Sequence, residues 1–243
     1  MQVIQFKCLC CSLCCRSSPL SLLPHEAIIL QKIAERYQLN VVIKPSFIIW
    51  DSKNNIGIVL SYVLLLNNDV CVFLKGSKCT LQNTYKPLIC RSFPFVPSYI
   101  RYFIDNKLKQ IVHYAKYGLS SLCPFVITIK EQQLQSIALD NKQRELSIPT
   151  IFPDEYEAYY ITEYLRMTYL SALSKLWQED LIDVSLQSDS TLLQYVNAYY
   201  IVKPFVDIAL LIIEKRAYLP IIMELLNIRT SKIGIKNNMD SMV

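Results

Sequence analysis

Five cysteines crowd into one short segment near the N-terminus, and no other feature restricts the fold of this chain as strongly. Residues 6–16 read FKCLCCSLCCR, and their cysteines are Cys8, Cys10, Cys11, Cys14 and Cys15. Three of them follow the spacing C-x-x-C-x-x-C, Cys15 comes directly behind, and Cys10 is additional. A segment this short and crowded favours a loop over a regular helix or strand. Such spacing lets a tight loop turn successive sulfurs toward one centre, so it predicts thiolate ligands for zinc or an iron-sulfur cluster.

Both kinds of centre need further ligands, and the rest of the chain offers Cys71, Cys79, Cys90 and Cys123. The first two stand on either side of a turn signal at residues 75–78, which predicts a hairpin with one thiol on each side. Pro124 follows Cys123 directly, as a proline follows the distal ligand in bacterial-type ferredoxin runs. With Cys10 left aside, the candidate metal ligands are Cys8, Cys11, Cys14, Cys15, Cys71, Cys79, Cys90 and Cys123.

So many cysteines also raise the question of disulfides, and the N-terminal residues bear on it. Lys7 and the cysteines interrupt any apolar stretch after Met1, so we expect no secretion signal and predict a cytoplasmic location. Because the cytosol keeps most thiols reduced, metal binding explains nine cysteines better than a disulfide framework does. Structural disulfides, as in the cytosol of hyperthermophiles, stay open as an alternative.

Two adjacent thiols bear on the number of metal atoms. Side chains of neighbouring residues diverge, so Cys14 and Cys15 do not easily bind a single zinc ion, whereas a multinuclear centre accommodates both. We therefore favour more than one metal atom and give iron-sulfur a slight preference over zinc, with both left open.

Basic residues near the cysteines bear on the charge of such a centre. Four thiolates around a dipositive centre leave a net negative charge, and we expect Arg16 and Arg91 to offset it. His25 and His113 are isolated in the sequence, which favours a structural or solvent-facing role over metal binding.

Hydrophobic patterns beyond the cysteine loop predict an α+β protein. Apolar residues at three- and four-residue spacing after Pro24 predict a helix through Tyr37. Short apolar runs over 41–95, broken by turn signals, predict a small antiparallel sheet. A second hairpin is expected where residues 99–104 meet 108–114. Further on we expect a polar, frayed tail over 230–243 and helices over 131–145, 154–181, 191–201 and 204–226.

This order of elements predicts two parts. Residues 1–128 are expected to form a small cysteine-rich metal-binding domain with short antiparallel hairpins. Residues 129–243 are expected to form a helical extension that covers this domain or binds a protein partner. A chain of 243 residues with 52% hydrophobic side chains is long enough to bury a core, and its net charge of +5 is weak support for an anionic partner. No apolar stretch approaches the roughly 20 residues of a transmembrane helix, so we expect no membrane association.

With their flanking residues, the cysteines resemble the YkgJ-type family of cysteine-cluster proteins over about residues 6 to 125. The resemblance rests on FKCLCCSLCCR, then CVFLKGSKCTLQNTYKPLICRSFPF, then CPF. It implies a zinc- or iron-chelating domain and no single biochemical activity, so whether the chain is an enzyme stays open. The sequence departs from the family pattern in three places: Cys10 is additional, Lys86 replaces the usual arginine, and no glycines follow Cys123-Pro124. The missing glycines make Cys123 the least secure of the candidate metal ligands.

Two other functions are alternatives for this sequence. The resemblance extends to flagellin lysine methylases that carry an iron-sulfur cluster, but the four glycines here are isolated, so a glycine-rich loop for a methyl donor is missing. A zinc-ribbon-like nucleic-acid binder is the second alternative, because basic and aromatic residues alternate. These residues are Lys86, Arg91, Phe93, Phe95, Tyr99, Arg101, Tyr102, Phe103, Lys107 and Lys109. A solvated hairpin explains them equally well, and the modest net charge leads us to expect no nucleic-acid partner.

The spacing of the N-terminal motif yields a first prediction. Cys11→Ser or Cys14→Ser should release metal and destabilise the protein, because binding to a structural metal site contributes to the free energy of folding. Cys10→Ser should change neither property. Metal content per chain and thermal unfolding of the three variants measure this difference, and equal metal loss in all three would contradict it.

Overall fold

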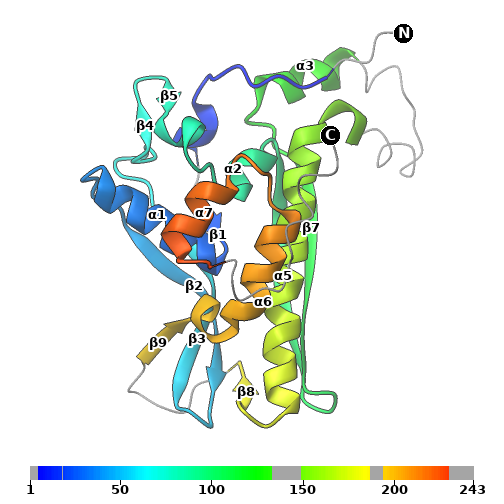
Figure 1. Ribbon diagram of the computed structural model, residues 1–243. Helices are drawn as coiled ribbons and strands as arrows, with labels where there is room; N and C mark the ends of the chain where they lie inside the picture. Colours follow the sequence, from blue (N-terminus) through cyan, green and yellow to red (C-terminus); the bar gives the residue numbers. More distant parts are fainter. Residues whose placement is uncertain (1–4, 18, 133–148, 187–193, 230–243) are drawn as a thin grey trace, which may run out of the picture.

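Helices and mostly antiparallel strands make up the protein, which confirms the predicted α+β class (Figure 1). The computed structural model describes residues 5–17, 19–132, 149–186 and 194–229. The strands are β1 (Leu20–Leu22), β2 (Ile43–Asp51), β3 (Ile56–Leu64), β4 (Leu74–Lys75), β5 (Lys78–Cys79), β6 (Phe95–Asp105), β7 (Gln110–Leu119), β8 (Val184–Ser185) and β9 (Gln194–Asn197). The helices are α1 (Pro24–Arg36), α2 (Leu88–Ser92), α3 (Pro124–Gln132), α5 (Pro153–Gln178), α6 (Ala198–Ile213) and α7 (Leu219–Leu226), with 3-10 turns η1 (Leu13–Arg16) and η2 (Thr80–Asn83).

A sheet in the order β1-β3-β2-β8 forms the centre, and β9 also pairs with β3. β3 reads IGIVLSYVL, and its near-continuous burial explains why an unbroken β-branched run forms this strand. The turn between β2 and β3 is stabilised by Asp51, whose carboxylate accepts hydrogen bonds from the backbone N–H groups of Lys53 and Asn54. β9 pairs with β3 in parallel, so the sheet is not antiparallel throughout.

Helix α1 confirms the predicted helix after Pro24, which occupies its first turn. Its apolar stripe, including Leu30 and Ile33, is fully buried against the sheet and α7. Tyr37 lies just beyond the end of α1 and is exposed.

The predicted second hairpin is confirmed as β6 and β7, and it is longer than expected. Helix α5 runs along one side of the hairpin (Figure 1). The alternating burial along β6 and β7 places every second side chain toward α5. Aromatic contacts join the two: the ring centroids of Tyr117 and Tyr159 lie 4.4 Å apart, and those of Phe95 and Tyr159 lie 4.9 Å apart.

The C-terminal half differs from expectation in two places. The predicted helix over 191–201 is wrong at its start, because residues 194–197 form β9 and Asn197 then caps α6 by accepting a hydrogen bond from Tyr199 N–H. The predicted helix over 204–226 is interrupted after Ile213, and α7 begins only at Leu219. The expected helix over 131–145 and the tail over 230–243 lie outside the described residues, apart from the end of α3.

A large buried core takes side chains from both sides of the predicted boundary at residue 128. Its members include Ile29, Leu30, Ile58, Phe73, Leu165, Leu173, Val206 and Leu210. β8 and β9 also bring the second half into the central sheet. The core is therefore shared, and the division into domains 1–128 and 129–243 stays a prediction.

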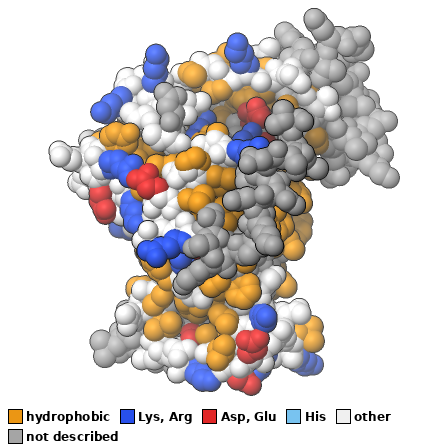
Figure 2. Space-filling view, in the orientation of Figure 1, with side chains coloured by type: hydrophobic (Ala, Val, Ile, Leu, Met, Phe, Trp, Pro, Cys, Tyr) orange, Lys and Arg blue, Asp and Glu red, His pale blue; other side chains and the backbone are white. Residues whose placement is uncertain are grey.

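The outer surface of α5 and α6 carries many apolar side chains, and Figure 2 shows hydrophobic groups gathered on this side of the molecule. Exposed residues of the two helices include Tyr160, Met167, Phe205, Ile208 and Ile212. Within the described ranges, no helix is both long and apolar enough to cross a membrane. A protein partner bound by this region stays a prediction.

Buried Glu26 ties α1 to the segment before α2. Its carboxylate accepts hydrogen bonds from Leu23 N–H at 2.9 Å, Leu88 N–H at 2.7 Å and the Tyr85 hydroxyl at 3.2 Å. Burial raises the pKa of Glu26 above its ordinary value, and these hydrogen bonds counteract the rise only in part.

The raised pKa of Glu26 predicts a pH dependence of stability. The folded protein holds this proton at a pH at which the unfolded chain has already released it, so the stabilising contribution is present below about pH 4.5 and is lost as the pH rises through the folded pKa. Glu26→Gln cannot titrate. The unfolding free energy of the wild type relative to this variant, measured with urea between about pH 4 and pH 8, should therefore fall with pH. A constant or rising difference would contradict the assignment.

Candidate functional site

The N-terminal cysteine segment is a loop, as predicted, with the short turn η1 at its end. It is anchored at its start by Phe6, whose N–H donates to Ile151 O at 2.7 Å and whose ring contacts Phe125 and Phe152. Cys10 and Ser12 have positive φ angles of 52° and 58°. The loop thus turns sharply twice between its cysteines.

A first group of thiols gathers where the end of this loop meets the β4–β5 hairpin. Cys71 N–H donates to Cys15 O at 2.8 Å, and the sulfurs of Cys14 and Cys15 lie 3.9 Å apart. Cys71 is part of the buried core, and Cys15 and Cys79 pack against it. The predicted hairpin between Cys71 and Cys79 is confirmed, with Cys79 on β5 opposite Leu74 on β4.

Cys90 joins this group from α2. Burial raises the pKa of the Cys90 thiol well above its usual range, and Cys71, Cys79 and Cys14 raise it further. Cys71 behaves similarly: burial raises its pKa, and Cys79 and Cys14 add to the rise. The hydrogen bond with Cys15 raises the pKa of Cys14, with burial as the second cause. These five thiols therefore lie near one another, although they come from three separate parts of the chain: the cysteine loop, residues 71–79 and α2.

A second group of thiols lies in a different apolar environment. Cys123 is buried in a small cluster with Val126 and Phe152, and Phe6 packs against this cluster. Burial raises the pKa of Cys123, and Cys11 and Cys8 raise it further. Both of these partners are exposed, as is the additional Cys10.

Lys86 supplies positive charge to the first group, because it lowers the pKa of both Cys14 and Cys90.

Arg91 was expected to offset the negative charge of a metal centre, and this role is wrong. Both Nη atoms of Arg91 donate to the Glu214 carboxylate, at 2.7 Å and 2.6 Å, and the side chains are 7% and 0% exposed. Its guanidinium also lies 4.5 Å from the centre of the Tyr218 ring. Arg91 thus fastens α2 to the segment after α6.

The two histidines have structural positions, in agreement with expectation. His25 is fully buried with Nδ1 3.2 Å from the Tyr169 hydroxyl, and burial together with the Arg91 charge lowers its pKa to about 3. His113 Nε2 lies 2.7 Å from the Glu163 carboxylate. Burial of Glu163 opposes its ionisation, yet the hydrogen bond with His113 and the Arg166 charge lower its pKa to about 2.

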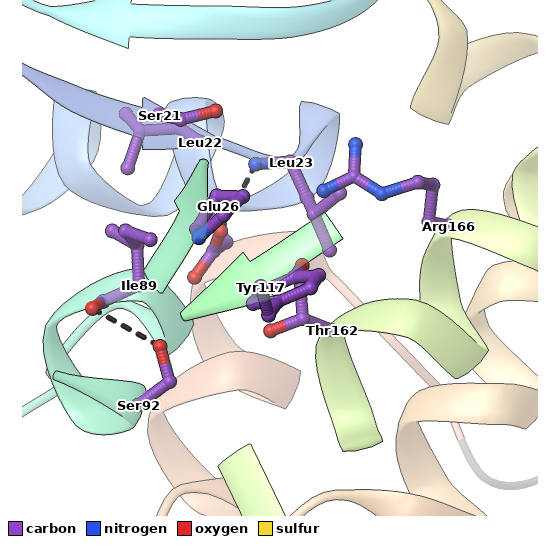
Figure 3. A pocket seen from close by; sticks show the side chains of 10 residues that line it. Ser21, Leu22, Leu23, Glu26, Ile89, Ser92, Tyr117, Thr162 and Arg166 are labelled. Carbon is purple, nitrogen blue, oxygen red and sulfur yellow. Dashed lines mark hydrogen bonds between the residues drawn. The ribbon is translucent and has the colours of Figure 1, made fainter. Parts of the chain in front are cut away.

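A small pocket next to Glu26 is too small to be a ligand-binding site. It has a volume of about 10 Å³, room for a single water molecule, and Figure 3 shows Glu26, Ser92, Thr162 and Arg166 around it. The carboxylate of Glu26 is already bound to backbone donors there, so the pocket is part of the polar interior.

The chemistry of the thiols suits metal binding, whereas their arrangement in this structure does not form a metal site. All nine cysteines are free. Among the described residues, no three His, Cys, Asp or Glu side chains are arranged to hold a metal ion. The donor set nevertheless suits zinc or iron-sulfur, which select soft thiolates. The thiols are gathered but do not point to one centre.

Sequence reasoning missed Glu26 and Glu214, the two buried carboxylates that hold the segment leading to Cys90. Glu214 directly follows the apolar run of α6, and a lone acid after such a run resembles an ordinary helix end. Glu26 stands in the first turn of a helix, where acids are common. Neither position carries a signal of its long-range partner.

Comparisons with known proteins add no assignment: no family model, no curated protein and no solved structure matches this chain. The resemblance to the YkgJ-type family therefore stays a prediction that rests on the quoted residues alone.

The Arg91–Glu214 pair yields a prediction about stability. Glu214→Gln leaves a buried guanidinium without its counter-charge, so the unfolding free energy should fall by about 3–5 kcal/mol. The matched control is Glu224→Gln, because Glu224 pairs with Arg36 at 2.7 Å but both side chains are largely exposed. That variant should lose at most about 1 kcal/mol. Urea unfolding measures both, and equal losses would contradict the role given to the buried pair.

Proposed function

We propose that this protein binds metal through cysteine thiolates, as an iron-sulfur or zinc protein. The observation that carries the proposal is the gathering of Cys14, Cys15, Cys71, Cys79 and Cys90 from three separate segments. Buried thiols with raised pKa values are unfavourable as free thiolates, and a bound cation removes that penalty because it takes the thiolate form directly. The nearby Lys86 offsets part of the remaining negative charge.

The first group would supply the tighter site. Cys14, Cys71, Cys79 and Cys90 offer four thiolates, the number of ligands in a closed zinc site or a cubane cluster, and Cys15 adds a fifth donor. Backbone contacts hold Cys71 at Cys15 and Cys79 opposite Leu74. Metal binding would require the thiol side chains to turn toward a shared point. The metal would supply either structural cross-linking or electron transfer, and the protein holds the ligands in place.

The second group would form a weaker or more open site. Cys8, Cys11 and Cys123 offer three thiolates, two of them exposed, so one coordination position would remain for another ligand. Two groups of donors agree with the preference for more than one metal atom. The predicted cytoplasmic location suits reduced thiols of this kind and is part of the proposal.

Anaerobically purified protein, also after cluster reconstitution, tests the proposal. An iron-sulfur centre predicts brown protein whose broad visible absorption bleaches with dithionite, with matched iron and sulfide. A zinc centre predicts colourless protein with stoichiometric zinc, since zinc has a filled d shell. Protein with neither metal would overturn the proposal.

Matched serine variants locate the ligands. Cys79→Ser and Cys90→Ser should each remove the metal of the first group, whereas Cys10→Ser should retain it. Cys123→Ser should lower metal content by at most the share held by the second group. Elemental analysis per chain measures all four variants, and full metal retention in Cys90→Ser would contradict the ligand set.

A further inference from the structure

The β6–β7 hairpin has an outer face whose side chains are not used for packing. In the register of this hairpin, Tyr99 lies opposite Lys116, Arg101 opposite Tyr114 and Phe103 opposite Val112. Directly opposed residues share a face, so these six side chains form one surface, called here the outer face. All six are exposed, with Phe103 at 49% and Tyr114 at 54%. The intervening residues face α5 instead.

Aromatic rings recur at each level of the outer face. Tyr99, Tyr114 and Phe103 stand at three successive levels, about 7 Å apart along the strands because each level advances by two residues. The ring centroids of Tyr99 and Tyr114 lie 5.7 Å apart. The Arg101 guanidinium lies 5.6 Å from the Tyr99 ring centre. The face is thus a row of rings with a cation among them.

The charges of the outer face have one sign. Arg101 and Lys116 are its charged side chains, and no carboxylate of the described residues forms an ion pair with either of them. Lys109 near the turn differs, since it pairs with Asp180. Asp105 at the tip accepts hydrogen bonds from Lys107 and Leu108 N–H groups, so its carboxylate serves the turn. At the levels of Tyr99 and Tyr114 the face therefore complements an anion, whereas Asp105 places a negative charge at the turn end.

The structure also changes which residues belong to this surface. Of the alternating basic and aromatic residues in the sequence, Arg91 and Phe95 are buried and Tyr102 faces α5, where it accepts a hydrogen bond from Arg166. Tyr114 and Lys116 on β7 take part instead.

Against the expectation from the modest net charge of the whole chain, we propose that the outer face binds single-stranded nucleic acid. Bases would stack on Tyr99, Tyr114 and Phe103, while Arg101 and Lys116 would face the phosphates. Exposed rings interleaved with cations on an open sheet surface suit unpaired bases, whose faces are accessible, better than a duplex, whose bases are already stacked. The thiol groups take no part in this surface, so the inference is independent of the proposed metal function.

Fluorescence anisotropy of the full chain with fluorescein-labelled oligouridine and oligothymidine 12-mers tests the inference. At 50 mM salt we expect dissociation constants of about 1–100 μM, and weaker binding to a duplex of the same length. The triple variant Tyr99→Ala/Phe103→Ala/Tyr114→Ala should bind at least about 100-fold more weakly, since each stacked base contributes about five- to 150-fold. Arg101→Ala/Lys116→Ala should reduce the salt slope by about 1.4, which is two phosphate contacts.

Two controls separate stacking from general effects on the surface. Tyr99→Phe/Tyr114→Phe keeps the rings and should bind within about twofold of the wild type. Tyr160→Ala/Tyr164→Ala/Met167→Ala removes an equal number of exposed side chains from α5 and should leave binding unchanged. Circular dichroism and thermal unfolding establish that each variant is folded.

Three outcomes would overturn the inference. One is the absence of binding to either oligonucleotide by folded wild-type protein at 50 mM salt. Another is equal loss of binding in the α5 control. The third is binding of vesicles of anionic phospholipid that the outer-face triple variant abolishes, without oligonucleotide binding, which would make this surface a membrane contact.

Discussion

Two buried carboxylates hold together the part of the molecule on which the remaining arrangement depends. Glu26 from α1 binds Leu88 N–H, and Glu214 after α6 binds Arg91, so both ends of one short segment are fixed to distant elements. Burying such charges is costly unless they are paired and hydrogen-bonded, and removal of either partner leaves the other uncompensated. The sheet, α2 and the C-terminal helices therefore cannot separate without exposing or orphaning these groups.

This constraint connects the cysteine-free half of the chain to the thiols. Cys90 precedes Arg91 directly, so the backbone next to Cys90 is held by a carboxylate that lies 123 residues beyond Arg91 along the chain. Residues after 128 hold no cysteine, and they act on the first thiol group through Glu214 and through the shared core. The helices thus help to hold the segment around Cys90, although they contribute no cysteine.

The hydrophobic periodicity of the sequence was sufficient to predict those helices and strands whose structure depends on their own residues. The stripe of α1 and the alternation of β6 and β7 are local patterns, and both elements formed as expected. Periodicity failed for β9, since residues 194–197 become a strand by pairing with β3, which lies far away in the sequence. It failed for Arg91 for the same reason: a basic residue next to a cysteine gives no indication of a partner at Glu214. The candidate thiols were visible from spacing, but their division into groups was not.

That division follows from the backbone of the cysteine loop. A regular C-x-x-C-x-x-C spacing suggests three sulfurs directed to one centre, yet Cys10 and Ser12 both adopt left-handed conformations, which reverse the chain between successive cysteines. A non-glycine residue in this region is disfavoured by roughly 1–2 kcal/mol, so it persists only where the surroundings hold the chain on both sides. Here Phe6 anchors the start of the loop in the cluster around Cys123, and Cys15 O anchors its end at Cys71. The two anchors lie in different apolar clusters, and the cysteines between them are divided accordingly.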